Sequence, residues 1–133
     1  MKNENTTNEL LWLALFYTAA SLLHFAHNAE FLSDYPNLPG WLSRSDVYLS
    51  WLGIAALGAF GCVLLRYGHE LFGLAVLAVY ACLGFDGLLH YGRAPFGAHS
   101  LAMNFTILFE VFAAALLLVA VLRRVARGSA RTP

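Results

Sequence analysis

The chain contains four long apolar stretches, and these restrict its fold more than any other feature. They cover about Leu10–His27, Val47–Leu65, Leu71–His90 and Ser100–Leu122. A helix needs ~20 predominantly apolar residues to cross the hydrocarbon core of a bilayer, and each stretch has about that length. The stretches are continuously apolar rather than alternating, which argues against a β-barrel, and they are rich in Leu and Ala, which favour helices. The sequence therefore predicts an all-α, polytopic membrane protein with a four-helix transmembrane bundle.

Composition points to the same class of protein. Of the 133 residues, 59% are hydrophobic and only 12% are charged, which is typical of membrane proteins rather than soluble domains. Little sequence remains outside the apolar stretches, so we expect a single domain over residues 1–133 that ends in a basic tail, residues 123–133. The formal net charge is zero, which gives no indication of a nucleic-acid partner. The expected partners are the lipid bilayer and either a second copy of the chain or the other subunits of a membrane complex.

The positions of Lys and Arg predict how the bundle is oriented. The segment after the fourth stretch carries four arginines, and an even number of spans places Lys2 and the turn at Arg66 on the same side. Only Arg44 and Arg93 fall on the opposite side. Because Lys and Arg accumulate on the cytoplasmic side of membrane proteins, we expect both termini in the cytoplasm. A bacterial inner membrane is the expected location.

Short similarities between the stretches indicate two related helical hairpins. SLLHF closes the first stretch and GLLHY the third, whereas VLLRYG and VLRRVA close the second and fourth. If the halves arose by duplication, His24 and His90 occupy equivalent positions, and a site between the halves is expected.

Four of the five histidines lie where the apolar stretches meet the predicted outer face. His24 and His27 close the first stretch, His90 closes the third and His99 opens the fourth. The fifth, His69, lies on the opposite side, in the turn between the second and third stretches. Four imidazoles at one membrane boundary predict a site on that face.

Helical spacing extends this outer layer. Residues three or four apart share a helix face, so Asp86 joins His90 and Met103 joins His99. Glu110 continues the stripe of His99, but it lies ~16 Å deeper at the helical rise of ~1.5 Å per residue. We therefore place Glu110 in the middle of the bilayer, separate from the outer layer.

The first interpretation of the outer layer is a transition-metal site. Imidazole is a good ligand for copper, zinc and iron, and a carboxylate completes typical ligand sets or fixes the tautomer of a ligating histidine. A thioether ligand would favour copper. Such an ion would serve catalysis on a small or lipid-soluble substrate, or metal handling. The candidate ligands are His24, His27, Asp86, His90, His99 and Met103.

Two further interpretations use only some of these residues. His24 could hold a haem b together with His90 or His99 for electron transfer, and Gly84 or Gly87 could make room for the macrocycle. In the other interpretation, the histidines are interfacial residues that bond to loop carbonyls within a structural subunit of a membrane complex.

A fourth interpretation is proton transfer without a metal. Ionisable groups inside a bilayer are costly and commonly functional. Asp86 and Glu110 could act as catalytic acid and base on a lipid-like substrate, with a histidine as partner. A carboxyl group at Glu110 is expected to be protonated because burial penalises its charged form. The loop residues Glu30, Asp34 and Tyr35 could cover the site.

Overall fold

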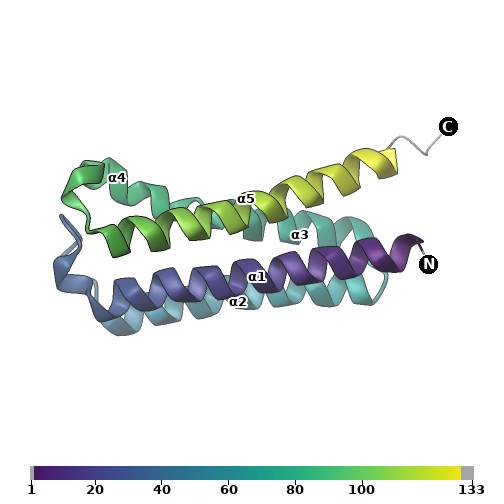
Figure 1. Cartoon of the computed structure of the whole chain (residues 1–133). Helices are drawn as coiled ribbons and strands as arrows, with labels where there is room; N and C mark the ends of the chain where they lie inside the picture. Colours follow the sequence, from purple (N-terminus) through teal and green to yellow (C-terminus); the bar gives the residue numbers. More distant parts are fainter. Residues whose placement is uncertain (1, 130–133) are drawn as a thin grey trace.

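Figure 1 shows the computed structural model of the chain, which describes residues 2–129. Its four long helical segments lie along one axis. The helices are α1 (Lys2–Glu30), α2 (Arg44–Arg66), α3 (Glu70–Leu83), α4 (Leu89–Arg93) and α5 (Leu101–Ser129). Short 3-10 turns accompany them: η1 (Leu32–Asp34), η2 (Asp86–Leu88) and η3 (Phe96–Ala98).

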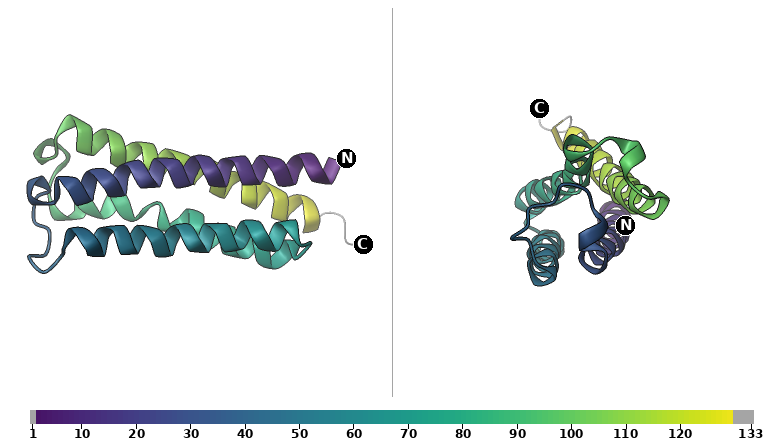
Figure 2. Two further views of the ribbon diagram at one scale, coloured as in Figure 1. Left: turned by 90° about the horizontal axis from the view of Figure 1, so that it is seen from below. Right: turned by 90° about the vertical axis from the view of Figure 1, so that its left-hand side faces the viewer.

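The helices form a four-membered bundle. α1 packs against α2 and α5, and α3 packs against the same two helices, so each of these helices has two neighbours (Figure 2). The start of α1 and the end of α5 lie at one end of the bundle, which we call the terminal end (Figure 1). The opposite end, which we call the loop end, is formed by residues 31–43 and 94–100.

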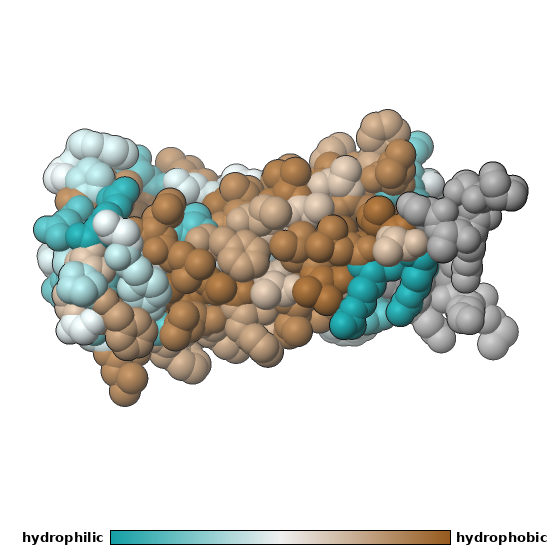
Figure 3. All heavy atoms as spheres, turned by 90° about the horizontal axis from the view of Figure 1, so that it is seen from above, coloured by the Kyte–Doolittle hydropathy of each residue, from teal (hydrophilic) through white to brown (hydrophobic). Residues whose placement is uncertain are grey.

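The length and surface of the bundle suit a membrane protein. Four segments are long and apolar enough to cross a bilayer: Thr7–Glu30, Arg44–Arg66, Glu70–Arg93 and Leu101–Gly128. Large apolar side chains face outward along them, including Trp12, which is 71% exposed. In Figure 3 this apolar surface covers the middle of the molecule, and hydrophilic residues gather at the loop end. The predicted all-α, four-helix architecture is confirmed.

Two helices are longer than their apolar stretches indicated. The first continues past His27 to Glu30, and the basic tail over 123–133 is helical as far as Ser129, with 130–133 outside the described residues. Polar residues at helix ends still make helical backbone hydrogen bonds, which hydropathy does not detect. The start of α2 is fixed by a capping box between Ser43 and Asp46.

The third apolar segment is not the continuous helix predicted over residues 71–90. α3 ends at Leu83, and the chain passes through η2 into α4. Close packing coincides with the interruption, because a Cβ atom on Gly84 would lie 2.5 Å from the Cβ of Ala114 and 2.7 Å from the ring of Tyr17. The η2 turn places Gly87 against α5, next to Ile107.

The interior changes character along the bundle. Towards the terminal end it is apolar, with Leu77, Ala113 and Leu117 fully buried. Tyr17 and Tyr80 lie at the boundary, with ring centroids 4.5 Å apart. Nearer the loop end, the interior is polar.

Candidate functional site

The interior near the loop end holds an unusual number of buried polar side chains. They project from α1, from α4 and α5, and, at His99, from the loop that joins α4 to α5. The buried polar residues are Ser21, His24, Asn28, His90, His99, Asn104, Thr106 and Glu110. Burial of polar groups is costly unless they are hydrogen-bonded, so this concentration points to a functional site.

His24 and Glu110 form the centre of this polar interior. His24 Nε2 lies 3.7 Å from Glu110 Oε2, and the two residues are 2% and 0% exposed. Helical spacing predicted that Glu110 lies apart from the outer histidines, but the structure brings it against one of them. The reason is the length of α1: because the helix continues to Glu30, His24 lies ~9 Å inside its end. Glu110 lies ~13 Å inside the start of α5, and the two meet there.

The hydrogen bonds of Thr106 define the state of His24. The Thr106 hydroxyl donates to the carbonyl of Met103 at 3.1 Å, so it is free to accept from His24 Nδ1, 3.4 Å away. This arrangement favours the tautomer of His24 with its proton on Nδ1. The lone pair on Nε2 then faces the Glu110 carboxyl group, which is the geometry of a neutral acid beside a base.

The third apolar segment packs against His24 and Glu110. A Cβ atom on Gly87 would lie 3.5 Å from Glu110 Oε2 and 3.7 Å from His24 Nε2. Asp86, the neighbouring residue, is half-buried, and its Oδ1 atom has no hydrogen-bond partner among the described residues. The interrupted segment thus places a second carboxyl group near the first.

His90 lies between His24 and the loop end. Its ring centroid is 5.6 Å from that of His24 and 6.2 Å from that of His99. The amide of Asn28 contacts His90 Nε2 at 3.3 Å. Three of the four predicted histidines therefore lie in a row that runs from Glu110 towards the loop end.

His27 occupies a different position, beside the loop. Its Nδ1 atom is 2.9 Å from the hydroxyl of Tyr35, whose ring packs on His90 at 4.9 Å. Tyr35 is only 3% exposed, so this loop residue covers the site as expected, whereas Asp34 is exposed. His27 and Asp34 line a pocket of ≈ 420 Å³ at the loop end.

His99 also bonds to the loop before α5, and Met103 packs beside Tyr35. His99 Nδ1 donates to the carbonyl of Pro95 at 3.1 Å, and Met103 packs with Tyr35 while its sulfur accepts from the backbone of Ser100 at 3.4 Å. His69 is exposed at the terminal end.

The predicted metal site does not gain support from this arrangement. Within residues 7–128, no group of three or more His, Cys, Asp or Glu side chains is placed to hold a metal ion. The room expected at Gly84 for a haem macrocycle is filled by Tyr17 and Ala114.

Several atoms of the site are buried without a hydrogen bond. Among the described residues, all such side-chain atoms except Trp51 Nε1 belong to the polar interior or to Tyr17, which borders it on the side of the terminal end. They are Tyr17 Oη, Ser21 Oγ, Asn28 Oδ1, Asp86 Oδ1, His90 Nδ1, His99 Nε2 and both Glu110 carboxyl oxygens. Each unpaired buried group costs ~1–3 kcal/mol. Their concentration in one place marks this interior as the candidate site.

Burial raises the pKa of the Tyr35 hydroxyl from 10.0 to about 12, against a smaller lowering by the nearby hydroxyl of Thr106. Because the folded chain holds this proton more tightly than the unfolded chain, its stabilising contribution is complete below pH 10 and is lost as the pH rises through 12. We expect the thermal stability of the purified chain to fall across this window, and to fall less in Tyr35→Phe. Tyr67→Phe, which alters an exposed hydroxyl, should behave like the unmodified chain. Identical pH profiles for Tyr35→Phe and the unmodified chain would contradict this assignment.

Comparisons of the chain with models of known protein families, with curated proteins and with solved structures found no match. The contacts of the buried polar residues are therefore what supports a function.

Proposed function

We propose that the protein is an integral membrane protein that carries protons between its loop end and Glu110 in the membrane interior. The observation that carries this proposal is the buried contact between His24 and Glu110, 3.7 Å apart, which places an acid beside a base. The distribution of Lys and Arg supports a cytoplasmic terminal end and a loop end that faces the periplasm or the outside of the cell. Glu110 would then serve as the proton-holding acid, with His24 as its partner.

A chain of side chains connects the pair to the loop end. It begins at the pocket that His27 lines and continues through the contact of His27 with Tyr35. The Tyr35 hydroxyl lies close to Thr106, which contacts His24 Nδ1. Every member is an imidazole, a hydroxyl or a carboxyl group, and each can pass a proton onward. With a pKa of about 12, the Tyr35 hydroxyl is protonated at neutral pH and has a proton to pass onward.

Loading of Glu110 follows from the tautomers of His24. Before transfer, His24 carries its proton on Nε2, Glu110 is ionised and the Thr106 hydroxyl points to Nδ1. The Nε2 proton then moves to Glu110 while Nδ1 takes the proton of Thr106, which Tyr35 replaces from its own hydroxyl. His27 restores the proton of Tyr35 and takes one from water. Thr106 then turns to the Met103 carbonyl, which gives the arrangement seen in the structure.

The relay can be tested through its hydroxyl link. The infrared carbonyl band of a protonated carboxyl group shifts when its proton exchanges for deuterium, so the exchange rate of Glu110 is measurable in the reconstituted chain. We expect Thr106→Val to slow this exchange about 10²-fold, because valine cannot relay a proton. Thr106→Ser should exchange at the rate of the unmodified chain. Thr18→Val, which removes a partly buried hydroxyl that is hydrogen-bonded to Tyr80, should also leave the exchange rate unchanged. Equal rates in all three variants would contradict the proposed relay.

A transition-metal site is the second candidate. The row of rings from His24 through His90 to His99, with centroids 5.6 and 6.2 Å apart, favours it, because small rotations would bring two imidazoles onto one ion. The Nδ1 atom of His90 and the Nε2 atom of His99 lack partners among the described residues.

This second candidate predicts a measurable metal content. Elemental analysis of protein freshly isolated from membranes should find about one copper, zinc or iron ion per chain. His24→Ala combined with His90→Ala should remove it, while His69→Ala, at the opposite end, should not. Metal below a tenth of the chain concentration in the unmodified protein would eliminate this candidate and leave the proton relay in place.

A further inference from the structure

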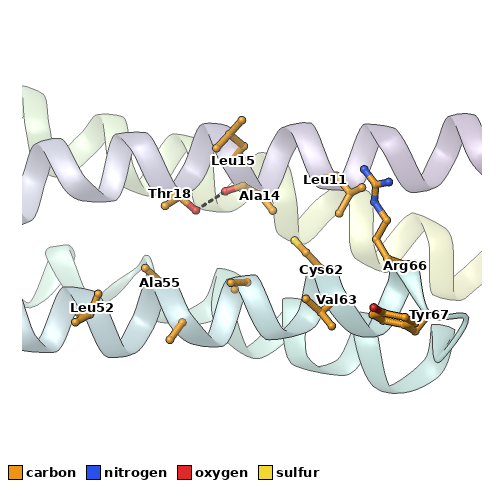
Figure 4. Close-up of a pocket in the computed structure, with 13 residues that line it drawn as sticks. Leu11, Ala14, Leu15, Thr18, Leu52, Ala55, Cys62, Val63, Arg66 and Tyr67 are labelled. Carbon is orange, nitrogen blue, oxygen red and sulfur yellow. Dashed lines mark hydrogen bonds between the residues drawn. The ribbon is translucent and has the colours of Figure 1, made fainter.

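An apolar groove separates α1 from α2 in the half of the bundle nearer the terminal end. It has a volume of ≈ 820 Å³ and is open to the outside of the bundle (Figure 4). Along α2 it extends from Leu52 to Arg66, a distance of ~21 Å at the helical rise. One leaflet of a bilayer has a hydrocarbon depth of ~15 Å, so the groove is long enough for a lipid chain.

Side-chain size explains why a groove is left here. Towards the loop end, Phe25, Val47 and Trp51 fill the space between α1 and α2. Towards the terminal end, α2 presents Ala55 and Ala59 to the gap, and these side chains are too small to fill it. The groove is therefore a consequence of the residue sizes along α2.

A single cation lies at the terminal end of the groove. Figure 4 shows Arg66 reaching from α2 towards Leu11 on α1, across the opening. Arg44 and Arg124 pair with carboxylates, but no described carboxylate pairs with Arg66. A guanidinium with no described carboxylate partner, at the membrane boundary and at the end of an apolar groove, is complementary to a phosphate group that is attached to a hydrocarbon chain.

We infer that this groove binds an anionic phospholipid, with one acyl chain between α1 and α2 and the headgroup phosphate on Arg66. The apolar lining with a cation at its edge favours a lipid, which joins a hydrocarbon chain to an anionic group, over a helix from a second copy or another protein. The charge of Arg66 favours an anionic headgroup. This inference does not depend on the proton relay.

Native mass spectrometry of the full chain in detergent tests the inference. The probes are phosphatidylglycerol, which is anionic, and phosphatidylcholine of the same chain length, which carries no net charge. We expect the chain to retain phosphatidylglycerol more strongly. Arg66→Gln should weaken its binding about fivefold, the effect of one arginine near a charged lipid. Arg123→Gln, an exposed arginine on α5 at the same end, should have a much smaller effect.

A second variant tests the hydrocarbon part of the groove. Ala59→Phe should fill the groove and reduce binding of both lipids at least fivefold, while Val119→Phe on the exposed face of α5 should not. Circular dichroism checks that each variant is folded. Equal retention of the two lipids, equal effects of Arg66→Gln and Arg123→Gln, or unchanged binding in Ala59→Phe would each overturn the inference. A change in oligomeric state in Ala59→Phe without loss of lipid would also overturn it, because a second copy would then occupy the groove.

Discussion

Replacement of His24 by Gln is expected to slow proton exchange at Glu110 by about 10²- to 10⁴-fold, the usual contribution of one positioned acid–base group. Gln can keep hydrogen bonds to Thr106 and Glu110, but it cannot take up and release a proton at neutral pH. The contact of 3.7 Å between His24 and Glu110 makes this histidine the last member of the relay. The measurement is deuterium exchange of the carboxyl carbonyl band by rapid-mixing infrared spectroscopy.

Three variants make this result specific. Glu110→Gln should remove the band and thereby assign it, whereas Asp86→Asn should leave it in place. His69→Gln, at the terminal end, is the matched control and should exchange at the rate of the unmodified chain. The proposed function fails if His24→Gln exchanges as fast as His69→Gln, or if the unmodified chain shows no band that Glu110→Gln removes.

Gly84→Ala should cause a large loss of stability for a single added methyl group. Its Cβ atom would lie 2.5 Å from Ala114 and 2.7 Å from Tyr17, so α3 would have to move away from both α1 and α5. Overpacking of this kind typically costs ~1–3 kcal/mol of the free energy of unfolding. The same change would shift Tyr17, which borders the polar interior on the side of the terminal end. Reversible unfolding in mixed micelles of mild and denaturing detergent measures the free energy of unfolding.

Two glycines of the same segment serve as controls for this prediction. Gly92→Ala adds a methyl group where nothing lies within 4 Å, and we expect no loss of stability. Gly87→Ala brings its Cβ atom only to 3.4 Å from Ile107, an ordinary contact, so its cost should be small. A Gly84→Ala variant as stable as Gly92→Ala would contradict the close packing of Gly84 against α1 and α5.

The sequence predicts those features of the fold that depend on residue order alone. The four apolar stretches give the helices, because a helix that crosses a membrane must be long and apolar wherever its neighbours lie. The capping residues Ser43 and Asp46 act within one turn, so the start of α2 is also readable from the sequence. The interruption after Leu83 is not, because it coincides with the close approach of Tyr17 and Ala114 from two other helices.

The sequence likewise predicts only some features of the candidate site. The sequence identifies His24, His90 and Glu110 as ionisable groups that are costly in apolar surroundings. This part of the prediction does not depend on which helices pack together. The sequence places Glu110 apart from the histidines, because the end of an apolar stretch is not the end of its helix. α1 continues to Glu30, so His24 lies deeper in the bundle than its apolar stretch indicates. The contact of Tyr35 with His27 depends on how the loop that carries Tyr35 folds.

The sequence by itself therefore determines the number of helices, their apolar character and the presence of ionisable groups among them, since these properties belong to single segments. Only the tertiary structure decides which of those groups meet. The contact of His24 with Glu110, the cover provided by Tyr35 and the groove below Arg66 depend on helix rotation, depth and spacing. Those quantities are set by side-chain packing between segments that are far apart in the chain, and for this reason no pattern within one segment reveals them.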